Sequence, residues 1–439
     1  MLKSSSKIYK KMNKALQSDS FLPWFVVLVA SLFFFYEFIQ MNMFNSLAQS
    51  FEKTFVLSTF QVGIVSGFYF LSDSILLYPA GFILDRFSSR RLLILGMLMC
   101  ILGTLCISSA TNSWILVLAR LLSGSASAFC LLSILRLAAQ WFPVERMGTV
   151  SGIVVTIGMF GGAISQTPLT LLIDHYEWRE ALTMVAGLGF LMLLLIFLVV
   201  RDAPPKYRYA HLQNERGVKP YGMWESLKEI TKNKVNWLIG LYICTMNLPI
   251  MILAGLFGTQ YMTQVRGFNN VESSSISMMI FIGTIVGSTL FGILSDLIGS
   301  RRKPMLITAI LSLILFLFIL YLPSLSYVSY LVLFFLLGFI TAAQVIGYPA
   351  TQESNPEVMV GSALGFISVL IMGLPGLLQP LVGFLMSYGW DGHMKSGVPV
   401  YSMHAYNLGL WVLVVGFLIS IFCAWAMPET FGKHRKGKK

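Results

Sequence analysis

Four ionisable side chains lie inside long apolar stretches of the sequence and are the residues best suited to chemistry. They are two carboxylic acids and two arginines, and their formal charges cancel: Glu37, Asp73, Arg120 and Arg136. A charge at the centre of a bilayer costs at least about 2.5–3.5 kcal/mol on insertion scales, so such residues are rare and mark ion or substrate pathways. No histidine lies in the middle of an apolar stretch. Any proton that is bound within these stretches must therefore be bound by a carboxylate, and carboxylates also suit a sodium ion.

The depth of these residues within their apolar stretches predicts how they pair. Glu37 lies nine residues from one end of its stretch, and Arg120 lies seven from the matching end of another, which is roughly 13 and 10 Å at 1.5 Å per residue. We predict a Glu37–Arg120 ion pair and a looser Asp73–Arg136 pair. The alternative is that both pairs only stabilise a helix bundle. Apolar replacement of a buried ion pair is often neutral or stabilising, so retention of the charges favours a functional role.

The apolar stretches that must position these charges number twelve. Hydrophobic residues make up 56% of the 439 residues and charged residues only 11%, which excludes a water-soluble enzyme. Runs of about 20 mostly apolar residues are long enough to cross a membrane as helices. We place them at 24–46, 58–82, 91–111, 113–141, 147–170, 180–200, 235–262, 275–297, 303–323, 326–350, 358–388 and 404–427.

A polar segment divides these stretches into two sets of six. We expect a basic cytoplasmic tail at 1–23, an N-terminal six-helix bundle at 24–200, a cytoplasmic linker at 201–234, a C-terminal six-helix bundle at 235–427 and a basic cytoplasmic tail at 428–439. With both termini in the cytoplasm, 25 of the 31 Lys and Arg residues fall on that side, as the positive-inside rule requires. Topology, and not nucleic-acid binding, then explains the net charge of +12. The first tail is either an interfacial helix on anionic lipid or a disordered segment.

The two sets of six stretches share an internal repeat. Glycine, aspartate and two arginines recur with the same spacing after the second and the eighth stretch, displaced by 211 residues. The matching residues are Gly81 and Gly292, Asp85 and Asp296, Arg90 and Arg301, and Arg91 and Arg302. A second correspondence matches Gln166 in the fifth stretch with Gln379 in the eleventh. We infer a duplicated six-helix unit.

The first of these repeated segments resembles the signature loop of the major facilitator superfamily. Leu116, Arg120 and Gly124 are similar to the second motif of that superfamily. The resemblance covers the whole chain and implies an all-α membrane protein of twelve transmembrane helices in two pseudo-symmetric six-helix bundles. Residues 33–38, which read Phe-Phe-Phe-Tyr-Glu-Phe, are similar to the bacterial phagosomal nutrient transporters, many of which carry amino acids. Gln40 stands where those transporters tend to have an arginine.

The resemblance also implies roles for the loop and for the cavity. It implies that the signature loop and its repeat form a latch that holds the outward-facing state, whereas the simpler alternative is that the loop arginines only set topology. The gating candidates are Gly81, Asp85, Arg86, Arg90, Arg91, Gly292, Asp296, Arg301 and Arg302. The substrate-binding candidates, each of which can instead be an interhelical hydrogen bonder, are Tyr36, Gln40, Tyr69, Arg136, Gln166, Asn247, Gln344, Tyr348 and Gln379.

These features predict a monomeric, multi-pass protein of the bacterial inner membrane that transports a small molecule. We expect a secondary active transporter, working by alternating access, that couples proton entry to uptake of a small polar or carboxylate-bearing solute such as an amino acid. A drug or metabolite efflux antiporter is one alternative, and a non-transporting membrane sensor on the same fold is another. The sequence has no phosphate-cradling loop for ATP. We expect no enzyme activity, cofactor, metal site or nucleic-acid partner.

Overall fold

The computed structural model describes residues 21–142, 146–202, 223–323, 325–356, 359–395 and 398–431 of the chain, with the backbone alone for residues 78, 81, 82, 85, 86, 223, 224 and 395. Nearly all of both predicted basic tails and most of the predicted linker therefore lie outside the described residues.

The first half of the described chain is a series of helices. They are α2 (Phe21–Asn42), α3 (Phe44–Phe55), α4 (Thr59–Arg86), α5 (Ser89–Ser108), α6 (Ser113–Trp141), α7 (Met147–Ile164) and α8 (Thr167–Val199). The second half repeats this pattern with two interrupted helices and a short hairpin. Its elements are α10 (Met223–Lys232), α11 (Lys234–Met246), the π-helix η2 (Pro249–Phe257), α12 (Gly258–Gln264), α13 (Asn270–Ile298), α14 (Arg302–Tyr321), α15 (Tyr327–Thr341), the 3₁₀-helix η3 (Ala342–Ile346), α16 (Gly347–Ser354), α17 (Val360–Tyr388), β1 (Met394–Lys395), β2 (Val398–Pro399) and α18 (Met403–Ala426).

Eleven segments of the described residues are long and apolar enough to cross a membrane. One of them, Met147–Val199, contains 53 residues, which as one helix would be about 80 Å long and more than twice the thickness of a bilayer core. Its helix breaks at Glu177, where φ is 59° and ψ is 158°. This segment therefore accounts for two crossings, and the predicted all-α fold of twelve transmembrane helices is confirmed.

The internal repeat is visible in how equivalent helices begin. Ser58 caps α4 by accepting a hydrogen bond from the Gln61 backbone N–H, and the Gln61 side chain accepts one from the Ser58 N–H. Asn269 and Glu272 form the same capping box at the start of α13, again displaced by 211 residues. Such a box satisfies two N–H groups that a helix start leaves without intrahelical partners.

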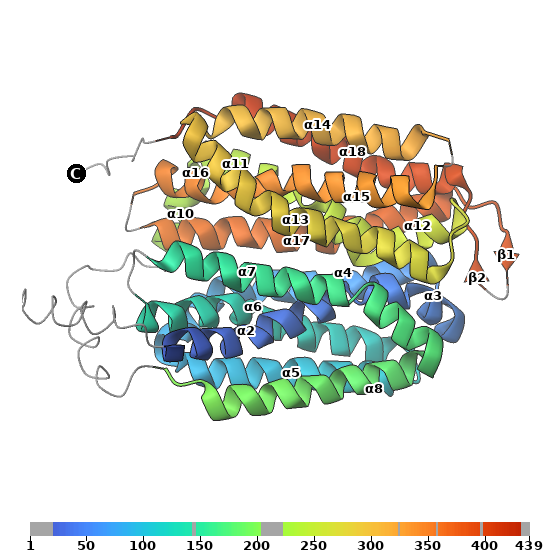
Figure 1. The fold of residues 1–439 in the computed structure, drawn as a ribbon, viewed down its shortest axis with the longest axis horizontal. Helices are drawn as coiled ribbons and strands as arrows, with labels where there is room; N and C mark the ends of the chain where they lie inside the picture. The colour runs from blue at the N-terminus through green and yellow to red at the C-terminus, as the bar shows by residue number, and fades with distance from the viewer. Residues whose placement is uncertain are drawn as a thin grey trace, which may run out of the picture.

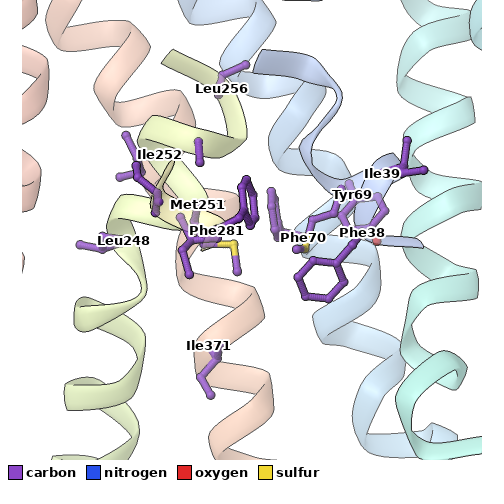
Figure 2. Packing of buried hydrophobic residues seen from close by; sticks show 14 of the residues in the cluster. Phe38, Ile39, Tyr69, Phe70, Leu248, Met251, Ile252, Leu256, Phe281 and Ile371 are labelled. Atoms are coloured by element: carbon purple, nitrogen blue, oxygen red, sulfur yellow. The ribbon is translucent and has the colours of Figure 1, made fainter. Parts of the chain in front are cut away.

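The two halves lie side by side, with α4 and α7 of the first half against α17 and α13 of the second (Figure 1). Helix α2 begins and α18 ends at the left of Figure 1, which we call the terminal end. The opposite end carries α3 and the β1–β2 hairpin, and we call it the hairpin end. Figure 2 shows buried apolar side chains of both halves converging between them, including Phe38 and Phe70 from the first and Met251 and Phe281 from the second.

Candidate functional site

A buried carboxyl cluster occupies the interior of the first half. Glu37 of α2 is 2% exposed. Its Oε1 atom accepts hydrogen bonds from the Tyr69 hydroxyl of α4 and, at 2.8 Å, from the Ser127 hydroxyl of α6. Asp73 of α4 is also 2% exposed, and it interacts electrostatically with Glu37. One oxygen of each carboxyl, Oε2 of Glu37 and Oδ1 of Asp73, has no hydrogen-bond partner among the described residues.

Arg120 of α6 is fully buried beside this cluster and is held by backbone oxygens and aromatic rings. Its Nη1 atom donates to the Gln40 carbonyl at 2.6 Å, and Nη2 donates to the Ser66 carbonyl at 3.3 Å. The guanidinium carbon lies 4.3 Å from the ring centre of Tyr69 and 4.4 Å from that of Phe44. Cation–π contacts of this kind become stronger when the groups are desolvated. Tyr69 therefore contacts both the carboxylate and the cation.

Neither predicted ion pair forms, because no described arginine lies within ion-pairing distance of Glu37 or Asp73. The Tyr69 ring packs against Arg120 and its hydroxyl bonds to Glu37. Asp73 follows Tyr69 by four residues on α4, so both side chains lie on one helix face, and this brings Asp73 beside Glu37. Arg136 is half-buried on α6, and its buried Nη1 atom has no hydrogen-bond partner among the described residues.

Two of the polar candidates on α2 bind α5. The Tyr36 hydroxyl lies 2.8 Å from the Thr104 hydroxyl, and the Gln40 side-chain amide donates to the same oxygen at 2.7 Å. Thr104 uses its own proton to donate to the Cys100 carbonyl, so it accepts both bonds. Tyr36 and Gln40 thus act as interhelical hydrogen bonders in this conformation. Sequence reasoning missed Thr104 and Ser127, although Ser127 lies two helical turns after Arg120 and therefore on the same face.

The polar candidates of the second half lie where two membrane helices lose regular geometry. Asn247 follows the last residue of α11 and precedes the π-helix η2, and Gln344 lies within the 3₁₀ segment η3. The Gln344 side-chain amide donates to Oδ1 of Asn247 at 3.1 Å. Interrupted helices at this depth are typical of transporter binding sites, and π-helical turns are frequent at functional sites. Tyr348, on α16, keeps 38% of its surface exposed.

The repeat-equivalent glutamines both donate to the π-helix. Nε2 of Gln166 lies 2.9 Å from the Ala254 carbonyl, and Nε2 of Gln379 lies 2.7 Å from the Met251 carbonyl. Gln166 reaches η2 from the other half of the molecule, whereas Gln379 reaches it from α17 in the same half. Both side chains are fully buried.

Further hydrogen bonds join the two halves at the hairpin end. The Asn45 side chain accepts a bond from the Thr259 backbone N–H of the second half at 3.0 Å. Within its own half, the Asn45 side chain donates to Gln166 Oε1 at 2.6 Å. Glu52 of α3 accepts a bond from Gln260 of α12 at 2.8 Å. Asn45 and Glu52 are not among the residues predicted from the sequence: Asn45 lies at the end of the first predicted stretch, and Glu52 lies in the predicted outer loop that follows it.

At the terminal end the predicted gating residues form local contacts. The Arg301 guanidinium pairs with Asp296 at 2.6 Å and with Glu353 at 2.9 Å, and Arg302 donates to the Trp425 carbonyl. A Cβ atom at Gly292 would meet no described atom within 4 Å. For Gly81, Asp85 and Arg86 the structure describes the backbone alone.

A carboxylate caps the helix after each signature loop. Asp202 accepts bonds from the Ser88 hydroxyl at 2.6 Å and from the Arg90 backbone N–H at 2.9 Å. Glu429 accepts the corresponding bonds from the Ser300 hydroxyl and, at 2.9 Å, from the Arg301 N–H. Arg91 is exposed beside the first cap. Each carboxylate comes from just beyond the last helix of its half, where it stabilises the positive end of the helix dipole.

Glu429 lies outside the membrane-spanning segments, and its environment favours the charged form. Partial burial acts to raise its pKa, but hydrogen bonds from Ser300 and from the backbone N–H groups of Arg301, Phe431 and Arg302 hold that pKa below its usual range.

Comparison with known proteins agrees with this architecture. The family model of the Major Facilitator Superfamily matches residues 26–380. A probable sulfoacetate transporter, SauU of Cupriavidus necator, is 22% identical over 284 residues, which are 62% of this chain and 65% of that protein. The membrane sensor UhpC of Escherichia coli is 23% identical over 372 residues, covering 80% of this chain and 83% of the sensor.

A solved structure shares the fold at low sequence identity. It is a bacterial homologue of the human lysosomal transporter Spinster in an inward-facing, unoccupied conformation, with a TM-score of 0.70 and 17% identity over 92% of this chain and 96% of that chain.

Proposed function

The chain belongs to the major facilitator superfamily, and from this we propose that it is a proton-coupled secondary active transporter. Its substrate is a small polar or carboxylate-bearing solute such as an amino acid, taken up by alternating access of the two halves. The fold places the described membrane helices in two repeated units.

An imbalance of charge in the buried cluster carries this proposal. Glu37 and Asp73 lie together away from water, and Arg120 is the one cation that interacts with Glu37 through space among the described residues. Two carboxylates and one guanidinium leave a net negative charge, and an uncompensated buried charge is costly. One proton shared by the two carboxyls makes the cluster neutral. Binding and release of that proton is the coupling step.

Arg136 supports a carboxylate-bearing substrate. A buried donor without an acceptor costs about 1–3 kcal/mol, and more for a charged group. A solute carboxylate bound at Nη1 would supply the missing acceptor. The similarity to a probable sulfoacetate transporter supports an anionic solute, since sulfoacetate carries a carboxylate.

The contacts between the halves support alternating access. Asn45, Glu52 and Gln166 hold the hairpin end closed, and a net cost of about 0.5–1.5 kcal/mol per hydrogen bond makes such contacts reversible. On α17, Gly383 and Gly376 pack against the backbone of α4, whereas a Cβ at Gly365 on the same face would meet no described atom within 4 Å. The close contact between α4 and α17 among the described residues therefore lies from Gly376 toward the hairpin end.

A sensor remains the second candidate because of one comparison. The match spans 83% of UhpC, so the short tails of this chain do not separate a sensor from a transporter. Uptake measurements in proteoliposomes test the proposed transporter against a sensor and against an efflux protein. The panel contains labelled amino acids, sulfonates, dicarboxylates and choline, each with and without an inward proton gradient. We expect gradient-dependent accumulation of a carboxylate-bearing solute. Saturable binding without movement of any solute would identify a sensor, and counterflow of an amphipathic drug alone would identify an efflux protein.

A further inference from the structure

Glu52 is a buried carboxyl that joins the two halves at the hairpin end. It belongs to α3, outside the membrane-spanning helices, and is 1% exposed. Its Oε1 atom accepts a hydrogen bond from the Thr59 hydroxyl at 2.7 Å, and Oε2 accepts one from the Gln260 side-chain amide at 2.8 Å. Thr59 begins α4 in the same half, whereas Gln260 lies on α12 in the other half. The carboxyl is therefore part of the contact that must break when this end opens.

No described cation compensates the charge of Glu52. Lys53, the next residue of α3, is exposed, and α12, η2 and β2 contain no charged residue. The charged residues of α8 nearest this end are exposed, and Arg179 stacks on Trp178 at 4.1 Å. The phenol of Tyr406 in α18 interacts with Glu52 electrostatically, but it is not a cation. Desolvation thus dominates and raises the pKa of Glu52 to about 7, although the bonds from Thr59 and Gln260 act to lower it.

We propose that Glu52 is a proton-binding site whose occupancy stabilises the closed contact between the two halves at the hairpin end. This inference rests on the alternating access proposed above. A protonated carboxyl keeps both contacts, because it donates to the Thr59 oxygen and still accepts from the Gln260 amide. The proton enters from the compartment that the hairpin end faces, and it is distinct from the proton at Glu37 and Asp73.

The direction of the effect follows from linkage. In the closed state the pKa of Glu52 is about 7, and contact with water on opening returns it toward its ordinary value of 4.5. The closed state therefore binds the proton more tightly, so protonation favours closure. This stabilisation is complete below the open-state value and is lost as the pH rises through about 7. Between these values closure takes up a proton, and the ratio of closed to open molecules changes by at most roughly 300-fold.

Distance measurements across the hairpin end test the proposal. We would attach spin labels to His175→Cys and Asn270→Cys, exposed positions on opposite halves, in the full chain reconstituted in nanodiscs after replacing the exposed Cys106 by serine. Glu37→Gln and Asp73→Asn in the same background remove the other buried protons. We expect the short-distance population to grow as the pH falls from 8.5 to 5. Glu52→Gln, which is uncharged at every pH, should give a large short-distance population that pH does not change.

The control is Glu180→Gln, which alters an exposed carboxyl at the same end and should retain the parent's pH response. The same pH response in Glu52→Gln as in the parent would overturn the proposal. Gln260→Met tests the contact from the other half and should reduce the short-distance population at low pH. If this variant instead showed the parent's short-distance population at every pH, that result would also contradict the proposal. A single distance under all conditions would instead refute alternating access itself.

Discussion

Gln166 and Gln379 occupy equivalent positions of the two repeats and donate to carbonyl oxygens three residues apart in the same π-helix, at Ala254 and Met251. The two bonds differ in what they join. The Gln166 bond crosses between the halves, whereas the Gln379 bond stays within the second half. In this conformation, one member of the pair thus joins the two halves, and the other joins α17 to the irregular helix of its own half.

This difference predicts distinct effects of the same substitution. Gln166→Leu should shift the population toward molecules open at the hairpin end, because it removes a bond found only in the closed state. Gln379→Leu should leave that population nearly unchanged and lower the free energy of unfolding by about 1–3 kcal/mol, since the Met251 carbonyl loses its donor. Cysteine accessibility at the hairpin end and chemical unfolding measure the two quantities. Equal shifts in accessibility would show that the glutamines are not distinguished in this way.

If Glu37 and Asp73 share the coupled proton, substitutions at either residue should affect proton-driven uptake and solute counterflow differently. Glu37→Gln and Asp73→Asn should each abolish uptake driven by a proton gradient, because a neutral amide cannot carry the proton. Counterflow, in which labelled solute exchanges against unlabelled solute, needs no net proton movement and should persist. The control is Asp174→Asn, an exposed carboxyl outside the cluster. Gradient-driven uptake by both cluster variants at the parent's rate would remove these residues from the coupling step.

Arg120 is predicted to be irreplaceable by lysine. Its guanidinium joins the Gln40 and Ser66 carbonyls and lies over two aromatic rings, whereas an ammonium is a point charge on a flexible stem. Arg120→Lys should therefore lower the free energy of unfolding by about 1–3 kcal/mol. Denaturant titration in detergent measures this difference, with Arg91→Lys at an exposed position as the control. Equal losses in the two variants would mean that the contacts of Arg120 contribute little.

The cap formed by Glu429 predicts a pH-dependent contribution to stability. Its pKa is held below the usual range in the folded protein, so the contribution is complete above the unfolded value and is lost as the pH falls. Glu429→Gln should lower the free energy of unfolding by about 0.3–1 kcal/mol at pH 7, and the difference should shrink below the ordinary glutamate pKa. Thermal unfolding at pH 7 and pH 4 measures it. A difference that is larger at pH 4 would reverse the assigned sign.

The sequence predicted the membrane helices and the repeat because long apolar runs and repeated motifs are local features. It failed for the ion pairs because depth along a helix says nothing about rotation around it. Arg120 and Arg136 are 16 residues apart on α6, which is about 160° of rotation, so they point to nearly opposite sides. Tyr69 and Asp73, four residues apart, share a face instead. Glu52 was missed because its burial depends on the other half of the molecule, which no local pattern reveals.

The same rotation makes Arg136 available for a ligand, and this gives the last prediction. A guanidinium on the opposite face of α6 from Arg120, whose Nη1 atom has no hydrogen-bond partner among the described residues, should bind a solute carboxylate directly. Arg136→Gln should raise the KM for a carboxylate-bearing solute by roughly 10-fold or more, because a charge-assisted hydrogen bond contributes about 1.5–3 kcal/mol. The maximal rate should fall far less, and Arg136→Lys should recover part of the affinity. Concentration-dependent uptake into proteoliposomes separates the two parameters. A fall in maximal rate at constant KM would place Arg136 in the conformational cycle and not in the substrate site.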